Sequence, residues 1–121
     1  MIELSPLAKT WILDVDGTIV KHNGHLKGGD VLLEGVKDFY SRISDEDKVI
    51  LLTARKDEYL EDLKMFLHKN NIRYDYILTD MPFGERILVN DRKPSGLNTA
   101  YAINKDRDDK LNIEFAINED L

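Results

Sequence analysis

The fold class follows from one stretch of sequence, Trp11-Ile12-Leu13-Asp14-Val15-Asp16-Gly17-Thr18, in which an apolar run leads into two carboxylates and a turn. The apolar run is typical of a buried β-strand, and α/β proteins place their functional groups just beyond the carboxyl ends of such strands. Because side chains alternate along a strand, Asp14 and Asp16 are expected to point the same way, about 6.5–7 Å apart. Two like charges at that spacing repel each other unless a cation lies between them, and Mg²⁺ suits hard carboxylate oxygens. The stretch therefore predicts a site for one cation or one phosphate group.

Two later apolar runs also end in polar residues. Val49–Leu52 is followed by Thr53-Ala54-Arg55, and Ile87–Val89 is followed by Asn90-Asp91. On its own, an Asp-Gly turn after a strand is ordinary turn chemistry. Three apolar runs that each finish in groups able to bind phosphate or metal favour a shared site over three unrelated turns.

Strand and helix patterns alternate along the chain, which is typical of a parallel sheet covered by helices. The expected strands are 11–13, 48–53, 74–78, 86–89 and 112–116, and the expected helices are 36–43, 57–69 and 95–103, the last capped by Ser95. We expect one α/β domain over residues 1–121. Its predicted architecture is a Rossmann-like three-layer sandwich, with a central, mostly parallel sheet, helices on both faces and no cap domain.

The composition of the chain argues against several classes of protein, among them nucleic-acid-binding and membrane proteins. The 121 residues include 17 Lys and Arg against 23 Asp and Glu, a formal net charge of −6, so most of the surface should repel nucleic acid. The chain has no cysteine, and no apolar stretch reaches the ~18–20 residues of a membrane-spanning helix. We expect a soluble, cytoplasmic protein that binds neither nucleic acid nor membrane. The acidic runs 45–47 and 106–109 are interpreted as solvated loops, because neither has the glycine and distal glutamate of a calcium loop.

The three strand ends, at Asp14–Thr18, Thr53 and Asp91, together resemble motifs one, two and four of the haloacid dehalogenase (HAD) superfamily of phosphohydrolases, over about residues 10–100. The resemblance implies that Asp14 is a nucleophile that becomes an aspartyl-phosphate, and that Asp16 is a general acid and base. The chemistry of these residues supports the roles. Phosphoryl transfer depends on in-line positioning and charge stabilisation, and a carboxylate nucleophile divides the hydrolysis into two easier steps.

The resemblance also implies a cofactor and a set of substrate contacts. Mg²⁺ would be held by Asp14, the main-chain carbonyl of Asp16 and Asp91, with waters completing an octahedron. Thr53 would hold the transferred phosphoryl group through its hydroxyl, together with nearby main-chain N–H groups. The expected substrate contacts are Gly17, Thr18, Ala54, Arg55 and Arg86.

The third motif departs from the pattern of the superfamily. A lysine is expected ahead of the fourth strand, but residues 79–85 contain none. Some cation must still offset the charge of Asp14 and of the phosphate. In order of preference, the candidates are Lys93, Arg86, and then Arg55 or Lys56.

Short connections leave no room for a cap domain over the predicted site. The segment between 18 and 35 can form a flap, over about 19–30, and the segment between 78 and 86 is shorter still. A bare site is open to water unless another surface covers it. The substrate is then a macromolecular phosphate, or a small one with a homo-oligomer acting as the lid. His22 and His25 in the flap either contact the substrate or lie on the surface.

The function expected from this resemblance is Mg²⁺-dependent hydrolysis of a phosphomonoester. Small cap-less relatives often serve capsule or cell-surface polysaccharide synthesis, and the segment 90–96 is similar to that group, so a sugar or polyol phosphate is the expected substrate. The alternative is a non-catalytic module that keeps the fold and binds phosphate or metal. The missing lysine and Asn90 suggest this alternative.

Overall fold

Parallel strands form the framework of the protein. In the computed structural model, which describes residues 1–121, three strands make one sheet in the order β2-β3-β4. They are β2 (Thr10–Asp14), β3 (Lys48–Leu52) and β4 (Tyr76–Leu78). Strands β1 (Ile2–Leu4) and β5 (Phe115–Ile117) pair with each other, also in parallel, as a second small sheet.

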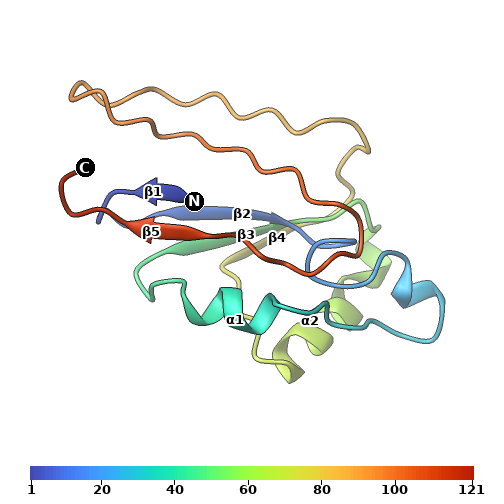
Figure 1. Cartoon of the computed structure of the whole chain (residues 1–121). Coiled ribbons are helices and arrows are strands. Elements are labelled where there is room, and N and C mark those ends of the chain that lie inside the picture. The colour runs from blue at the N-terminus through green and yellow to red at the C-terminus, as the bar shows by residue number, and fades with distance from the viewer.

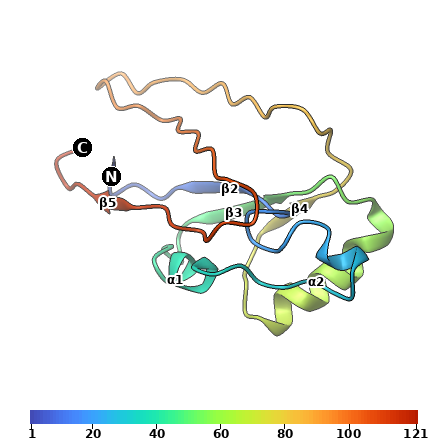
Figure 2. The ribbon, with the colours of Figure 1, turned by 45° about the vertical axis from the view of Figure 1, so that its right-hand side comes forward.

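The two helices cover one face of the three-stranded sheet (Figures 1 and 2). Helix α1 (Val36–Ser41) connects β2 to β3, and α2 (Leu60–Lys69), preceded by the 3₁₀ turn η2 (Asp57–Tyr59), connects β3 to β4. Both helices form where the apolar spacing predicts them, because a stripe of apolar residues on each can be buried against the sheet. Helix α2 also carries acidic residues in its first turn and basic residues in its last, as the helix dipole favours.

The hydrophobic core lies between the sheet and these helices. Phe39 of α1 and Leu63 and Leu67 of α2 are completely buried against it. The buried apolar residues form one cluster of 13: Leu13, Val15, Ile19, Val20, Val36, Phe39, Ile43, Val49, Leu51, Leu63, Leu67, Ile72 and Leu111. Trp11 extends the cluster towards the smaller sheet, since its ring contacts those of Phe39 and Phe115 with centroids 5.3 and 5.1 Å apart. None of the helices is long and apolar enough to cross a membrane.

The segment from 79 to 114 contains no helix and no strand. Figures 1 and 2 show it running out and back on the side of the sheet opposite the helices, and we call residues 83–105 the arm. The expected strand at 86–89 and the expected helix at 95–103 are therefore wrong. The protein is a mixed α/β fold with parallel strands in two small sheets, and helices lie on one face of the main sheet rather than on both.

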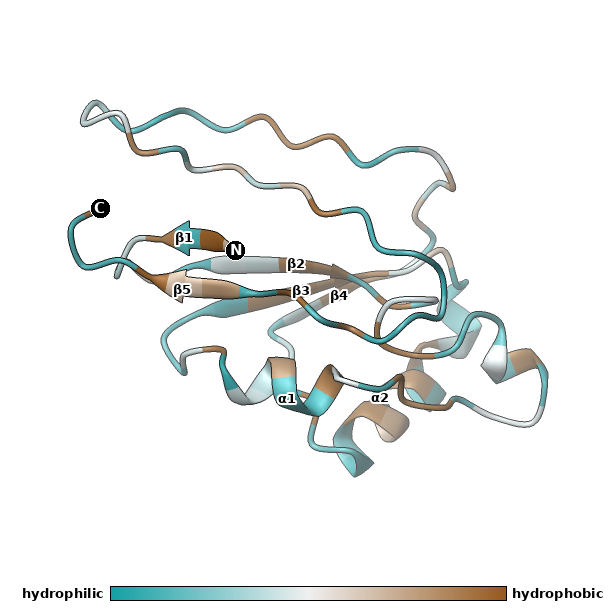
Figure 3. Cartoon of the chain, in the orientation of Figure 1, coloured by the Kyte–Doolittle hydropathy of each residue, from teal (hydrophilic) through white to brown (hydrophobic).

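Both errors have a physical reason. An apolar run becomes a strand only where a neighbouring strand accepts its backbone hydrogen bonds, and Ile87 and Val89 have no such neighbour, remaining 85% and 89% exposed. Figure 3 shows these hydrophobic stretches along the arm. The expected helix contains Gly96, which adopts a left-handed φ of 97° and closes a turn by donating from its N–H to the carbonyl of Lys93.

The acidic run 45–47 is only partly solvated, which corrects the expectation from sequence. Asp47 is 4% exposed, and its carboxylate accepts hydrogen bonds from the indole Nε1 of Trp11 and from the main-chain N–H of Lys9, each at 2.9 Å. Asp47 therefore joins β2 to the turn before β3. Its neighbours Asp45 and Glu46 are exposed, as expected.

Candidate functional site

Two chain segments meet at the carboxyl end of the sheet. The parallel register places Asp14, the last residue of β2, opposite Leu52, the last residue of β3. The ladder continues beyond the strands, because the N–H of Val15 donates to the carbonyl of Leu52 and the N–H of Thr53 to that of Leu78. Residues 14–18 and 53–55 therefore lie side by side, as the sequence pattern indicates for the first two strand ends.

A tight turn follows Asp14 and sets the direction of the next side chains. The N–H groups of Thr18, Ile19 and Val20 all donate to the carbonyl of Val15. Gly17 has a left-handed φ of 85°, and a Cβ there would lie 3.2 Å from the Cγ of Arg107. This turn therefore requires glycine at position 17 for both its conformation and its close contact.

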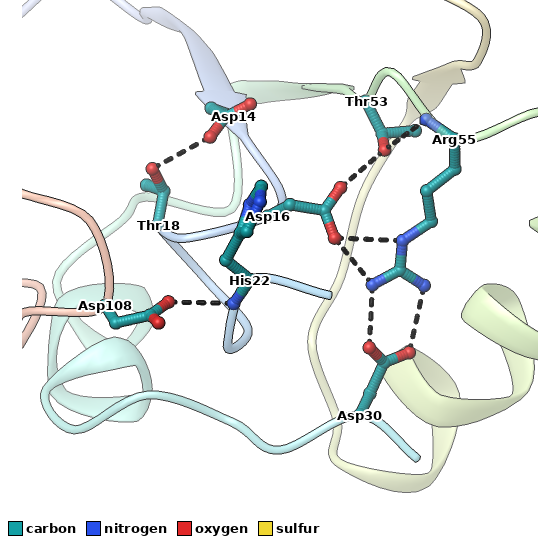
Figure 4. A network of polar contacts seen from close by, with 8 residues as sticks. All are labelled: Asp14, Asp16, Thr18, His22, Asp30, Thr53, Arg55 and Asp108. Atoms are coloured by element: carbon teal, nitrogen blue, oxygen red, sulfur yellow. Dashed lines mark hydrogen bonds and ion pairs between the residues drawn. The ribbon is translucent and has the colours of Figure 1, made fainter. Parts of the chain in front are cut away.

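The Asp14 carboxylate faces two donors and remains partly open to solvent. Its Oδ2 accepts a hydrogen bond from the hydroxyl of Thr18 at 3.1 Å (Figure 4), and its Oδ1 accepts one from Nη1 of Arg86 at 2.7 Å. The side chains of Asp14 and Arg86 are 35% and 39% exposed. The Asp14 carboxylate therefore lies beside a cation and within reach of solvent.

Asp16 points the other way into a buried network, shown in Figure 4. Its Oδ2 accepts a hydrogen bond from the Thr53 hydroxyl at 2.8 Å, and its Oδ1 accepts two from Arg55, from Nε at 3.0 Å and from Nη2 at 2.8 Å. The main-chain N–H of Arg55 in turn donates to the Thr53 hydroxyl oxygen at 3.1 Å. The expectation that Asp14 and Asp16 point the same way is therefore wrong: β2 ends at Asp14 and a turn follows, so the strand alternation does not extend to Asp16.

Arg55 has a second partner, Asp30, that no pattern in the sequence predicts. Asp30 accepts from Nη1 and Nη2 of Arg55 at 3.0 and 2.7 Å, and only 2% of the Arg55 side chain and 6% of the Asp30 side chain are exposed. Burial by itself lowers the pKa of Arg55, but the hydrogen bonds to Asp30 and Asp16 raise it, and the net change is upward. The sequence shows only that a charged side chain, Arg55, follows Thr53 by two residues and would need an anion if it were buried.

The flap, residues 19–30, packs against the start of helix α2. The ring of His25 meets that of Tyr59 edge to face with centroids 4.9 Å apart, and its Nδ1 is buried without a hydrogen-bond partner. Burial, followed by the nearby positive charge of Arg55, lowers the pKa of His25. The side chain of His22 makes no such contact, but its main-chain N–H donates to Asp108 at 2.8 Å (Figure 4).

Among the cations considered for the missing lysine, Arg86 is the one that contacts Asp14. Lys93, which the sequence favoured, lies in the turn of the arm, where its main-chain N–H donates to the carbonyl of Leu97. Lys56 forms an exposed ion pair with Asp80. The structure therefore places Arg86, the second candidate from sequence, at Asp14, because the beginning of the arm lies beside the carboxyl end of β2.

The third expected metal ligand is not part of this group. Asp91 lies on the arm, where its carbonyl accepts a hydrogen bond from Thr99, and no set of three or more His, Asp or Glu side chains is arranged to hold a metal ion. Both oxygens of the Asp14 carboxylate already accept hydrogen bonds, one of them from the guanidinium of Arg86. The donor set in this arrangement does not fit Mg²⁺, and Arg86 supplies positive charge at Asp14 instead.

Two main-chain donors near Asp14 are unused. The N–H groups of Asp16 and Ala54 donate to no acceptor in the protein, although both residues lie where the two strand ends meet. Together with Arg86 and the Thr18 hydroxyl, they provide the kind of fixed donors that stabilise a phosphoryl group. Comparison of the chain with models of protein families, with curated proteins and with solved structures finds no match.

Proposed function

We propose that this protein is a phosphomonoester hydrolase of the HAD type in which Asp14 is the nucleophile. The observation that carries the proposal is the environment of Asp14: a partly exposed carboxylate at the carboxyl end of a parallel strand, 2.7 Å from the guanidinium of Arg86. Arg86 would neutralise the charge that otherwise keeps a carboxylate away from a phosphate. The free N–H groups of Asp16 and Ala54 would bind the equatorial phosphoryl oxygens.

The reaction would proceed in two steps. In the first, an oxygen of Asp14 forms a bond to phosphorus, the bond from phosphorus to the alcohol oxygen breaks, and the leaving alcohol takes up a proton, for which the sequence resemblance nominates Asp16 as the donor. In the second, water attacks the aspartyl-phosphate, its proton passes to Asp16, and inorganic phosphate and the Asp14 carboxylate are released. A hydroxyl both donates and accepts, so the bond between Thr53 and Asp16 can persist in either protonation state of Asp16.

The sequence resemblance implies Mg²⁺, but the donor set at Asp14 does not fit the ion. The proposal therefore assigns the positive charge beside Asp14 to Arg86. Titration of activity with Mg²⁺ and with a chelator measures directly whether the enzyme requires the ion.

The parallel order β2-β3-β4 with its two crossover helices is the part of the expected Rossmann-like fold that supports the proposal.

The proposed substrate is a small sugar or polyol phosphate, consistent with a role in capsule or surface polysaccharide synthesis in the cytoplasm. The net charge of −6 disfavours nucleic acid as the substrate. No cap domain interrupts the chain, and the flap reaches Arg55 and Tyr59 through Asp30 and His25. A second copy of the chain acting as a lid would complete the exclusion of water.

The test is turnover of a panel of phosphorylated metabolites and of an aryl phosphate by wild type and by Asp14→Asn. We expect phosphate release by wild type alone, and a mass gain of one phosphoryl group on the wild-type protein after acid quenching. Absence of turnover with every substrate, with and without Mg²⁺, would overturn the proposal.

The alternative, a non-catalytic module that binds phosphate, is favoured by one observation. All four carboxylate oxygens of Asp14 and Asp16 are already engaged, two of them by arginine. In that case inorganic phosphate would raise the temperature of unfolding through Arg86, but no substrate would be hydrolysed. Measuring both the temperature of unfolding with inorganic phosphate and the turnover of substrate distinguishes the two functions.

A further inference from the structure

The guanidinium of Arg55 has every nitrogen committed to a carboxylate. Nη1 donates to Asp30, Nε donates to Asp16, and Nη2 donates to both. Figure 4 shows the guanidinium lying between the two carboxylates. These four hydrogen bonds use four of the five N–H donors of Arg55, and because its side chain is only 2% exposed, the remaining one is not open to a phosphate from outside. The interpretation of Arg55 as a substrate contact therefore loses its geometric basis.

The backbone holds Asp30 in place independently of Arg55. Beside it, the N–H of Lys21 donates to the carbonyl of Val31 at 2.9 Å, and the N–H of Leu33 donates to that of Ile19 at 2.9 Å. These bonds close the base of the flap. The two oxygens of the Asp30 carboxylate are thus held opposite two nitrogens of the planar Arg55 guanidinium. In this bidentate geometry a carboxylate fixes the orientation of an arginine side chain.

From this arrangement we propose that Asp30 is a positioning residue: it holds Arg55 in the orientation in which the Arg55 guanidinium fixes the carboxylate of Asp16. Arg55 then acts on Asp16 and not on the substrate. The flap contributes to the reaction through this contact, in addition to any shielding of the site. This inference rests on the proposed function for its kinetic consequences, but the contacts themselves can be tested without activity.

The kinetic test uses Asp30→Asn, which keeps the size of the side chain, and Arg55→Lys, which keeps its positive charge. Both variants lose the bidentate contact between Asp30 and Arg55. Displacing Asp16 should reduce kcat for an alkyl phosphate, whose leaving group needs a proton, by about tenfold or more, while KM and turnover of an aryl phosphate change little. The matched control is Asp80→Asn, since Asp80 pairs with the adjacent Lys56 at the surface. We expect this control to match wild type. A raised KM with unchanged kcat in Arg55→Lys would instead identify Arg55 as a substrate contact and overturn the proposal.

The structural test needs no turnover, so it separates failure of this inference from failure of the proposed function. Asp16→Asn, Asp30→Asn and the double variant are compared by urea unfolding. Because Arg55 links the two carboxylates, the double variant should differ in stability from the sum of the single losses. Additive losses, in folded variants with wild-type circular dichroism, would show that Asp30 does not act on Asp16 through Arg55.

Discussion

Nη1 of Arg86 donates a hydrogen bond to Oδ1 of Asp14 at 2.7 Å, although the two residues are 72 positions apart in the sequence. Arg86 comes from the segment that follows β4, which contains no regular structure, and Asp14 is the last residue of β2. The contact therefore places a permanent positive charge at Asp14, whose side chain is more exposed than that of Asp16. Arginine remains protonated at any working pH, so this charge does not depend on pH.

Arg86 is expected to matter more than Lys93. Replacing Arg86 by alanine removes the only cation that contacts Asp14, and we expect kcat/KM for a phosphomonoester to fall by about 10²-fold, as for the loss of one transition-state donor. Lys93→Ala is the control, and steady-state kinetics should place it close to wild type. A large loss in Lys93→Ala with normal kinetics in Arg86→Ala would restore the order expected from sequence.

Asp14→Asn should abolish turnover while preserving the fold. The amide keeps the shape of the carboxylate and one oxygen acceptor for Arg86 or Thr18, but it is not a nucleophile. Phosphate release and thermal unfolding, measured on the same preparation, check both halves of this expectation. Asp120→Asn, an exposed acid near the C-terminus, serves as the control for the loss of one charge. Activity of Asp14→Asn near that of wild type would remove the nucleophile assignment.

Arg55 is expected to be essential for stability. Arg55→Met leaves Asp16 and Asp30 without their shared cation, and breaking a buried ion pair from one side usually costs about 3–5 kcal/mol. Urea unfolding followed by circular dichroism measures the loss. Arg92→Met on the exposed arm should change the free energy of unfolding by less than about 0.5 kcal/mol. Equal effects of the two substitutions would mean that the network around Arg55 contributes little.

Acidification should destabilise the protein through His25. Burial holds the pKa of this side chain below its ordinary value of 6.5, so the unfolded chain binds the proton more tightly than the folded one. The contribution of neutral His25 is complete above pH 6.5 and is lost as the pH falls from 6.5 through the lower folded-state pKa. The charges that face His25 are those of Arg55, Asp16, Asp30 and His22.

This pH dependence can be isolated by comparing unfolding of wild type and His25→Gln between neutral and mildly acidic pH. The variant should lose less stability on acidification than wild type does. Parallel curves for wild type and His25→Gln would contradict the expectation.

Asp47 should stabilise the start of the sheet. Asp47→Ala leaves the indole N–H of Trp11 and the main-chain N–H of Lys9 without their acceptor, at a cost of about 1–3 kcal/mol for each donor that stays buried. Chemical unfolding checks this value, and the exposed neighbour supplies the control, Asp45→Ala. We expect the control to lie within about 0.5 kcal/mol of wild type.

The sequence by itself determined the local elements and the two strand ends that form the site. Apolar runs and helical spacing located β2, β3, β4, α1 and α2, because each of these elements is specified by residues near one another in the chain. The parallel order of the strands followed from their alternation with helices, and it brings Asp14–Thr18 beside Thr53. Polar residues after a strand could therefore be assigned to one edge of the sheet before any contact was known.

Only the tertiary structure decided which distant groups complete the site. The apolar run at 86–89 reads as a strand, but no neighbouring strand accepts its hydrogen bonds, so it lies exposed on the arm and Asp91 stays away from Asp14. The sequence named Arg86 and Arg55 among several candidate cations, but only the structure pairs Arg86 with Asp14 and Arg55 with Asp16 and Asp30. Burial and ion pairing depend on where the chain returns in space, and neither spacing nor composition carries that information.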